Sequence, residues 1–245
     1  MAFLDGPRPY AVAHRGFAPN GDENSMAAFQ RAVDLGYTYL ETDVRVTADG
    51  VALAFHDATL DRLTDHRGRV DAVPWALARR ARIAGAEPIA LLADVLATWP
   101  HARVNIDVKS RRAIQATIDV VRRTRAADRV CIGAFATRRI RAVRQALGAA
   151  VCTSYGPAAV VSLRVAGRAR GRGAGCIEAP AVVGGRRFID ARYVRAAHTA
   201  GLPLIAYTVN VRAEMHRLLD LGVDGLMTDR ADLLRAVLQE RGQWQ

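Results

Sequence analysis

The segment 13–62 holds three groups of polar side chains that could act on a phosphate ester, and each group closes a short apolar run. His14-Arg15-Gly16 closes the first run, Glu41-Thr42-Asp43 the second and His56-Asp57 the third. Imidazoles titrate near neutral pH, as general acids and bases require. An arginine can donate two parallel hydrogen bonds to phosphate oxygens. These residue types together indicate acid–base chemistry on a phosphate ester.

A later run, Asn105–Lys109, repeats the pattern of polar residues at alternate positions. Side chains two residues apart share one face of a strand, as Glu41 and Asp43 would. With Asp107 they would form an oxygen site for one divalent cation, Mg²⁺ or Ca²⁺ rather than zinc. Lys109 would add a compact positive charge. Alternatively, these side chains could lie on an outward, solvated face of their strands or form an internal salt bridge.

The elements that must position these residues alternate along the chain, which indicates parallel strands with helical crossovers. The expected strands are Tyr10–His14, Tyr39–Asp43, Val104–Lys109, Val130–Phe135, Ala150–Tyr155, Gly175–Ala179, Pro203–Thr208 and Asp224–Thr228. The expected helices are Ser25–Leu35, Ala90–Trp99, Arg112–Thr124, Thr137–Leu147, Ala158–Ala166, Asp190–Ala200, Arg212–Leu219 and Ala231–Glu240. This α/β order predicts a TIM (β/α)8 barrel, whose active site lies at the carboxyl ends of the strands.

One apolar run, Val51–His56, is extra to the barrel strands. Asp49-Gly50 is a strong hairpin turn, and too few residues precede the run for a parallel crossover. We therefore expect Val44–His56 to form a hairpin over the barrel mouth that returns His56 toward the carboxylates. The irregular stretch Asp57–Glu87 is expected to be a small insertion within one domain that spans residues 1–245.

The composition of the 245-residue chain, 51% hydrophobic and 24% charged, is ordinary for a globular protein. No apolar run approaches the ~18 residues of a membrane span, and the first residues do not resemble a secretory signal. Cys131, Cys152 and Cys176 are odd in number and lie in apolar runs. Buried, reduced thiols favour a cytoplasmic location.

The formal charge of +11 could indicate a nucleic-acid or anionic-membrane partner. However, the arginines are scattered, and Lys109 is the only lysine, which is typical of a GC-rich genome. The densest cluster, residues 167–175, is expected to be a solvated connection. We therefore expect a small-molecule substrate and no nucleic acid.

Several motifs occur in the order and spacing found in the glycerophosphodiester phosphodiesterase family, which the chain resembles over nearly its whole length. They are His14-Arg15-Gly16, Glu23-Asn24-Ser25 with Ala28-Phe29, Glu41-Thr42-Asp43-Val44, Thr47-Ala48-Asp49-Gly50, His56-Asp57 with Leu60-Asp61-Arg62, Asn105–Lys109, Tyr207–Asn210 and Gly222–Asp229. The resemblance implies a barrel enzyme that uses a divalent ion to split glycerophosphodiesters into glycerol 3-phosphate and an alcohol.

The resemblance also implies a role for each candidate site residue. It assigns acid–base catalysis to His14 and His56, and phosphate binding to Arg15 and Lys109. It assigns the metal, Mg²⁺ or Ca²⁺ with Mn²⁺ as a further option, to Glu41, Asp43 and Asp107. In the family's proposed route the glycerol hydroxyl attacks phosphorus, and water then opens the resulting cyclic phosphate.

The sequence departs from the family pattern at four positions. Asp107 replaces a glutamate, Asp22 a proline, Ser25 a threonine and Tyr207 a tryptophan. Ser25 can cap the following helix as threonine would, and Tyr207 would offer the substrate a smaller aromatic wall. Because aspartate is one methylene shorter than glutamate, we expect Asp107 to alter metal affinity more than the reaction itself.

Two other functions remain open. The first is a lysophospholipase D or sphingomyelinase D-like enzyme, which would need an exposed apolar rim at the barrel mouth. The stretch Val44–Glu87 offers only Val73-Pro74-Trp75 for such a rim, which favours water-soluble diesters. The second is a non-catalytic basic binding protein on a decayed barrel. Tyr155 and Glu178 could line the pocket or lie outside it, and the oligomeric state is open.

Overall fold

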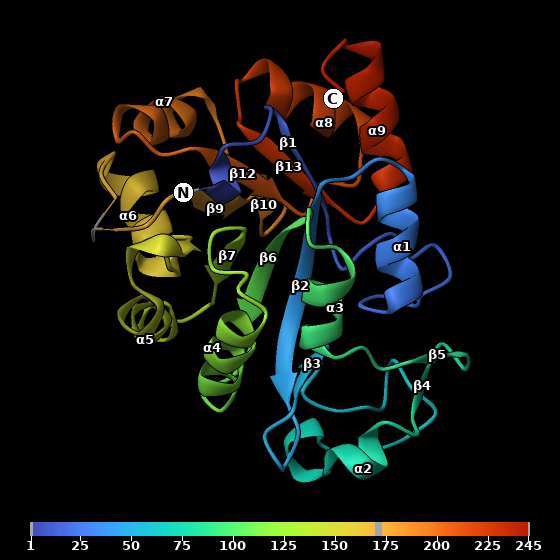
Figure 1. Cartoon of the computed structure of the whole chain (residues 1–245). Helices are drawn as coiled ribbons and strands as arrows, with labels where there is room; N and C mark the ends of the chain where they lie inside the picture. The colour runs from blue at the N-terminus through green and yellow to red at the C-terminus, as the bar shows by residue number, and fades with distance from the viewer. Residues whose placement is uncertain (1, 170–172, 245) are drawn as a thin grey trace.

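Eight parallel strands form the central sheet of the computed structural model, which describes residues 2–169 and 173–244 (Figure 1). The sheet has the order β8-β7-β6-β2-β1-β13-β12-β9. These strands are β1 (Tyr10–Ala13), β2 (Tyr39–Val46), β6 (Arg103–Val108), β7 (Val130–Gly133), β8 (Cys152–Thr153), β9 (Ile177–Pro180), β12 (Leu204–Tyr207) and β13 (Gly225–Thr228). A parallel bridge between Ser154 and Cys176 joins the two ends of the sheet, β8 and β9, and closes the barrel. The predicted fold is confirmed.

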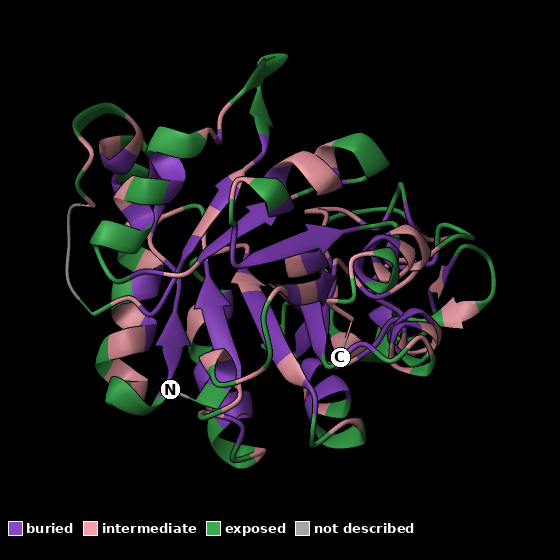
Figure 2. Cartoon of the chain, turned by 90° about the horizontal axis from the view of Figure 1, so that it is seen from above, coloured by how far each residue is buried: buried purple, intermediate pink, exposed green. Residues whose placement is uncertain are grey.

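Helices surround the strands, and burial is concentrated along the strands (Figure 2). They are α1 (Met26–Asp34), α3 (Leu92–Thr98), α4 (Ala113–Arg123), α5 (Thr137–Leu147), α6 (Pro157–Ala166), α7 (Ala191–Thr199), α8 (Arg212–Asp220) and α9 (Ala231–Glu240). The expected cap of α1 is present, because the Ser25 hydroxyl accepts from the Ala28 amide at 3.0 Å. Within the described residues, no helix is long and apolar enough to cross a membrane.

The predicted hairpin over the barrel mouth is present, and its first arm is the continuation of β2. That strand runs unbroken past Asp43 to Val46 and pairs antiparallel with β3 (Ala52–Ala54). The Phe55 amide donates to the Asp43 carbonyl at 2.9 Å, which fixes the return of His56.

The insertion that follows the hairpin is a small unit with its own apolar cluster. It contains α2 (Trp75–Ala78), η2 (Val70–Ala72), β4 (Arg82–Ile83) and β5 (Glu87–Pro88). Leu60 and Ile83 pack in this cluster against Leu53 and Phe55 of the hairpin. The insertion is thereby attached to the hairpin that carries His56.

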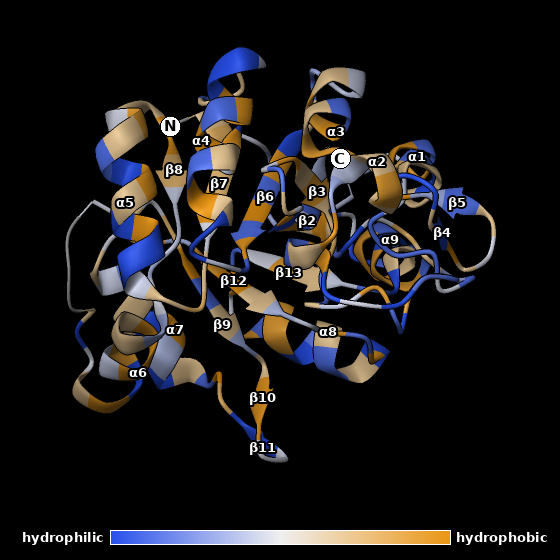
Figure 3. Ribbon diagram, turned by 90° about the horizontal axis from the view of Figure 1, so that it is seen from below, coloured by the Kyte–Doolittle hydropathy of each residue, from blue (hydrophilic) through white to orange (hydrophobic). Residues whose placement is uncertain are grey.

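A second hairpin follows β9 and projects away from the barrel (Figures 2 and 3). Its arms are β10 (Val182–Val183) and β11 (Arg186–Arg187), and both are exposed. The expected loop 167–175 is described only in part, because residues 170–172 lie outside the described residues.

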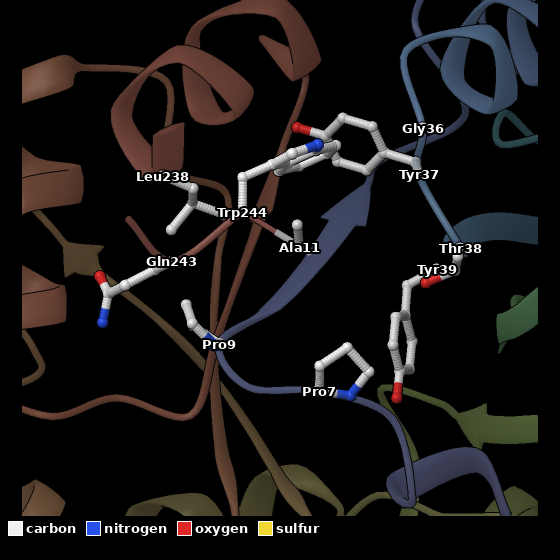
Figure 4. A pocket seen from close by; sticks show the side chains of 10 residues that line it. All are labelled: Pro7, Pro9, Ala11, Gly36, Tyr37, Thr38, Tyr39, Leu238, Gln243 and Trp244. Carbon is white, nitrogen blue, oxygen red and sulfur yellow. The ribbon is translucent and has the colours of Figure 1, made fainter. Parts of the chain in front are cut away.

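The amino ends of the strands are closed by the first residues of the chain. Phe3 of η1 (Ala2–Leu4) is fully buried, and its carbonyl accepts from the Tyr39 hydroxyl at 2.8 Å. A small cavity of about 20 Å³ lies nearby, where the Tyr37 and Trp244 rings meet at 5.1 Å (Figure 4). That volume corresponds to about one water molecule, so this cavity is too small to hold a substrate.

Candidate active site

The carboxyl ends of the strands surround a cavity of about 440 Å³. The structure brings every predicted site residue to this cavity: His14, Arg15, Glu41, Asp43, His56, Asp107, Lys109 and Tyr207. They meet there because inward-facing positions alternate along each strand, and parallel strands present their carboxyl ends at one mouth.

His14 follows β1, and a carboxylate from the far end of the chain holds its ring. Nδ1 of His14 lies 2.6 Å from Oδ1 of Asp229, and Nε2 lies 3.8 Å from Oε2 of Glu41. Asp229 accepts in turn from Nδ2 of Asn210 at 2.6 Å. Burial lowers the pKa of His14, but the charge of Glu41 and the bond to Asp229 outweigh it and raise the pKa.

The turn after His14 places Arg15 back over the barrel. Arg15 and Gly16 have φ angles of +54° and +81°. A Cβ at Gly16 would lie 2.6 Å from the backbone of helix α1, so glycine is required there. Nη1 of Arg15 donates to Oε1 of Glu23 at 2.8 Å, and Nε lies 2.8 Å from Oδ2 of Asp43. Its guanidinium is thus anchored at the edge of the cavity.

The carboxylates on β2 and β6 share a single ammonium group. Nζ of Lys109 lies 2.7 Å from Oδ1 of Asp43 and 2.6 Å from Oδ2 of Asp107. Burial raises the pKa of Asp43, but the charges of Lys109 and Arg15 outweigh it, and the pKa is lowered. Burial first, and then the charge of Asp43, raise the pKa of Glu41 to about 8. The cluster carries more carboxylates than nearby cations can neutralise fully.

The donor chemistry of these carboxylates suits a hard cation. Oδ1 of Asp107 is buried and accepts no hydrogen bond from any described residue. However, Glu41, Asp43 and Asp107 do not bring three oxygens within 4.8 Å of one another in the described part of the chain. The Lys109 ammonium lies between the two aspartates instead, so a cation would have to compete with it.

The ring of His56 is also held by a carboxylate, here its immediate neighbour. Nδ1 of His56 lies 2.6 Å from Oδ1 of Asp57, and the other oxygen of this carboxylate, Oδ2, accepts from Nε of Arg62 at 2.6 Å. The bond to Arg62 and the bond to His56 overcome burial and lower the pKa of Asp57. In both cavity histidines Nδ1 is therefore engaged, which leaves Nε2 to face a ligand.

Asn24, which had no role in the sequence prediction, contacts a cavity residue, and Glu178, which the sequence left open between a pocket and an outer position, lines the cavity. Asn24 has a φ of +61° and donates from Nδ2 to Oδ2 of Asp43 at 3.1 Å. Its motif was visible in the sequence, but its contact was not. Glu178 faces the cavity floor and accepts a hydrogen bond from Asn105. Burial raises the pKa of Glu178 to about 7.

One wall of the cavity is apolar and partly open to solvent. Phe135, 65% exposed, meets the Tyr207 ring edge-on at 6.4 Å, and the Lys109 ammonium lies 5.6 Å from the Phe135 centroid. Val161 and Val183 also line the cavity and are more than half exposed. An apolar rim therefore exists, and it is built from segments other than Val44–Glu87, the stretch in which the sequence offered only Val73-Pro74-Trp75.

Known proteins match this chain over nearly its whole length. The model of the glycerophosphoryl diester phosphodiesterase family matches residues 14–233. "Probable glycerophosphodiester phosphodiesterase 2" of Mycobacterium tuberculosis is 42% identical and is aligned over 100% of this chain and 96% of its own. A glycerophosphodiester phosphodiesterase of Caldanaerobacter subterraneus is 28% identical, with coverages of 94% and 98%.

Solved structures with less than 25% identity share the fold. A phosphodiesterase of Oleispira antarctica, in complex with the product sn-glycerol-3-phosphate, has a TM-score of 0.80 at 21% identity, with 95% of this chain and 97% of that chain covered. A glycerophosphodiester phosphodiesterase of Agrobacterium tumefaciens has a TM-score of 0.77 at 23% identity, with coverages of 94% and 98%. On the family match and the full-length relative, this chain belongs to the glycerophosphoryl diester phosphodiesterase family.

Proposed function

We propose that this protein hydrolyses glycerophosphodiesters to glycerol 3-phosphate and an alcohol, with His14 and His56 as the acid–base pair. One observation carries the proposal: two imidazoles, each with Nδ1 on a carboxylate, face one cavity that Arg15 and Lys109 also line. A carboxylate on Nδ1 orients the ring and makes Nε2 a better base. The product complex of the Oleispira antarctica relative supports this choice of substrate.

The two histidines suit a reaction in two steps. In the first, the glycerol hydroxyl attacks phosphorus, the new O–P bond closes a cyclic phosphate, and the bond to the alcohol breaks. One histidine takes the proton of the hydroxyl while the other gives a proton to the departing alcohol. In the second step water opens the ring, and the two histidines exchange roles. Because the attacking hydroxyl and the phosphorus belong to one molecule in the first step, the reaction gains from proximity.

Arg15 and Lys109 are the groups that would hold the phosphate. The guanidinium can bind two phosphate oxygens at once, and the ammonium is a point charge. Both now pair with Asp43, at 2.8 and 2.7 Å. A diester in the cavity would offer them a second anionic partner.

We infer that Glu41, Asp43 and Asp107 would hold one divalent cation, Mg²⁺ or Ca²⁺, with Mn²⁺ as a further option. When bound, the ion would polarise a phosphate oxygen and offset the charge that develops on it. The unsatisfied oxygen of Asp107 and the raised pKa of Glu41, about 8, support this inference. If an ion bound Asp43 and Asp107 in place of the Lys109 ammonium, this ammonium would be free to pair with the phosphate.

The test is release of glycerol 3-phosphate from glycerophosphocholine with Mg²⁺, Ca²⁺ or Mn²⁺. We expect a chelator to abolish release, and His14→Ala or His56→Ala to lower kcat by roughly 10²–10⁴-fold. His66→Ala is the matched control, because His66 also pairs with a neighbouring aspartate, Asp65 at 2.8 Å, but does not line the cavity.

No release with any ion would refute the proposal, as would release that neither the chelator nor His14→Ala diminishes. Strongly salt-dependent DNA binding by such an inactive protein would then favour the basic binding protein.

The apolar rim favours a second candidate, a lysophospholipid phosphodiesterase. Phe135, Val161 and Val183 could contact an acyl chain that glycerophosphocholine lacks. The test compares lysophosphatidylcholine with glycerophosphocholine, using Phe135→Ser and, as control, Leu77→Ser, a half-exposed position on α2 that does not line the cavity. Cleavage of the lipid alone, lost in Phe135→Ser but kept in Leu77→Ser, would establish the lipid enzyme. Equal rates for wild type and Phe135→Ser on both substrates would exclude a role for the rim.

A further inference from the structure

Three thiols converge inside the barrel, one layer below the cavity. Cys131 on β7 is paired in register with Cys152 on β8, and Cys176 directly precedes β9. Their three Sγ atoms lie within 4.8 Å of one another, and those of Cys131 and Cys176 are 3.7 Å apart. All three residues are free and fully buried. We call them the cysteine triad.

The position of the cysteine triad follows from strand alternation. The residues two places further along the same strands line the cavity floor: Gly133, Ser154 and Glu178. Side chains two apart share a face, so the thiols form the next layer inward. They belong to an apolar cluster that also includes Tyr10, Tyr39, Ile205 and Met227.

We propose that the cysteine triad is a binding site for a thiophilic metal ion held by three sulfur ligands, with Cu(I) as the preferred ion. Metal–sulfur bonds of about 2.3 Å in a trigonal plane would place the sulfurs about 4.0 Å apart. The observed separations, 3.7 Å for one pair and below 4.8 Å for all, fit that triangle with small movements.

The ligand set decides between metals. A structural zinc site has four ligands, and among the described residues no histidine or carboxylate joins the cysteine triad in its group. Soft thiolates select Cu(I), which accepts three sulfurs. Each thiol that binds as a thiolate releases its proton to solvent. The Arg144 guanidinium, which donates to the Thr153 hydroxyl at 3.1 Å, brings a positive charge next to Cys152.

The alternative is that the thiols only fill space, since buried cysteine packs as a small apolar residue. The distribution of the cysteines along the chain argues against this alternative. The chain has three cysteines, and all three meet at one point from three different strands or strand ends. The site is independent of the proposed hydrolysis and uses none of its residues.

The test is an anaerobic titration of the reduced protein with Cu(I), supplied in acetonitrile and competed by bicinchoninate. Because the site is buried, the protein is also refolded from urea with Cu(I) present. We expect one ion per chain, three sulfurs at about 2.3 Å by X-ray absorption, and a higher Tm. Cys131→Ala and Cys152→Ala should each weaken binding at least about 100-fold, as loss of a ligand does. Met227→Leu, which removes the buried thioether of the same apolar cluster, should leave the affinity for Cu(I) unchanged.

A wild-type measurement covers the case in which a cysteine variant does not fold. Cu(I) should protect all three thiols of the native chain from alkylation when the protein is briefly exposed to denaturant. No binding after refolding, a nitrogen- or oxygen-dominated absorption spectrum, or affinity unchanged in Cys152→Ala would overturn the proposal. Full alkylation in the presence of Cu(I) would overturn it as well.

Discussion

Glu178 gives the clearest link between the buried charge of the cavity and the stability of the fold. Burial raises the pKa of its carboxyl group to about 7, although Asn105 and Ser154 donate hydrogen bonds to it. This value exceeds the ordinary 4.5, so the folded state holds the proton more tightly than the unfolded state. Glu178 therefore costs no stability below pH 4.5, costs progressively more as the pH rises to about 7, and its cost is complete above that.

Glu178→Gln keeps the shape of the side chain and removes this titration. The interval from 4.5 to about 7 corresponds to about 3 kcal/mol, at about 1.36 kcal/mol per pKa unit. Because the carboxylate borders an open cavity, solvent screens part of this penalty. We expect the variant to gain about 1–3 kcal/mol of unfolding free energy over wild type between about pH 4 and about pH 8.

The assay is urea unfolding of both proteins at the two pH values, in the presence of a chelator so that no cation binds the neighbouring carboxylates. Glu240→Gln is the control, because it makes the same change at a surface carboxylate that is 53% exposed and does not line the cavity. The reasoning would be refuted if the difference between Glu178→Gln and wild type were equal at both pH values, or if it fell at the higher one.

Two further predictions concern the turn and the partner of the first histidine. Asp229→Asn removes a charge that raises the pKa of His14, so the limb of the pH–activity profile that His14 controls should shift to lower pH, with about 10–100-fold less activity. Asp232→Asn, at a surface ion pair, should change neither, and a profile with neither limb shifted in Asp229→Asn would contradict the assignment. Gly16→Ala should cost about 2–5 kcal/mol in urea unfolding, because it adds contact with helix α1 to left-handed strain. Gly50→Ala, with φ +87° and open space around it, should cost only about 1–2 kcal/mol, and equal losses would show that the contact does not matter.

Much of the fold could be predicted because its signals are local. Each barrel strand is a short apolar run bounded by polar or glycine residues, and each observed strand overlaps its predicted range. The end of β2 was misplaced by three residues, at Asp43 instead of Val46, because the hairpin turn lies beyond it. The Asp49-Gly50 turn predicted the pairing with β3, but not that the first arm of this hairpin continues β2 without a break.

The rim of the cavity could not be predicted in the same way. Any apolar rim was expected in Val44–Glu87, which directly follows Glu41 and Asp43 along the chain. The apolar rim comes instead from Phe135, Val161 and Val183, which follow β7, lie on α6 and form part of the β10–β11 hairpin. These segments face the cavity only because the closed barrel brings β9 next to β8.

The sequence by itself determined which side chains share one face of a strand, because a strand alternates its faces with a period of two residues. Glu41 and Asp43 had to lie together on β2 for that reason. Only the tertiary structure decided the partners: Asp229 for His14, and Lys109 between Asp43 and Asp107. It also gathered the cysteine triad. Those contacts join strands that become neighbours when the barrel closes. The separation of these strands along the chain does not indicate which of them become neighbours.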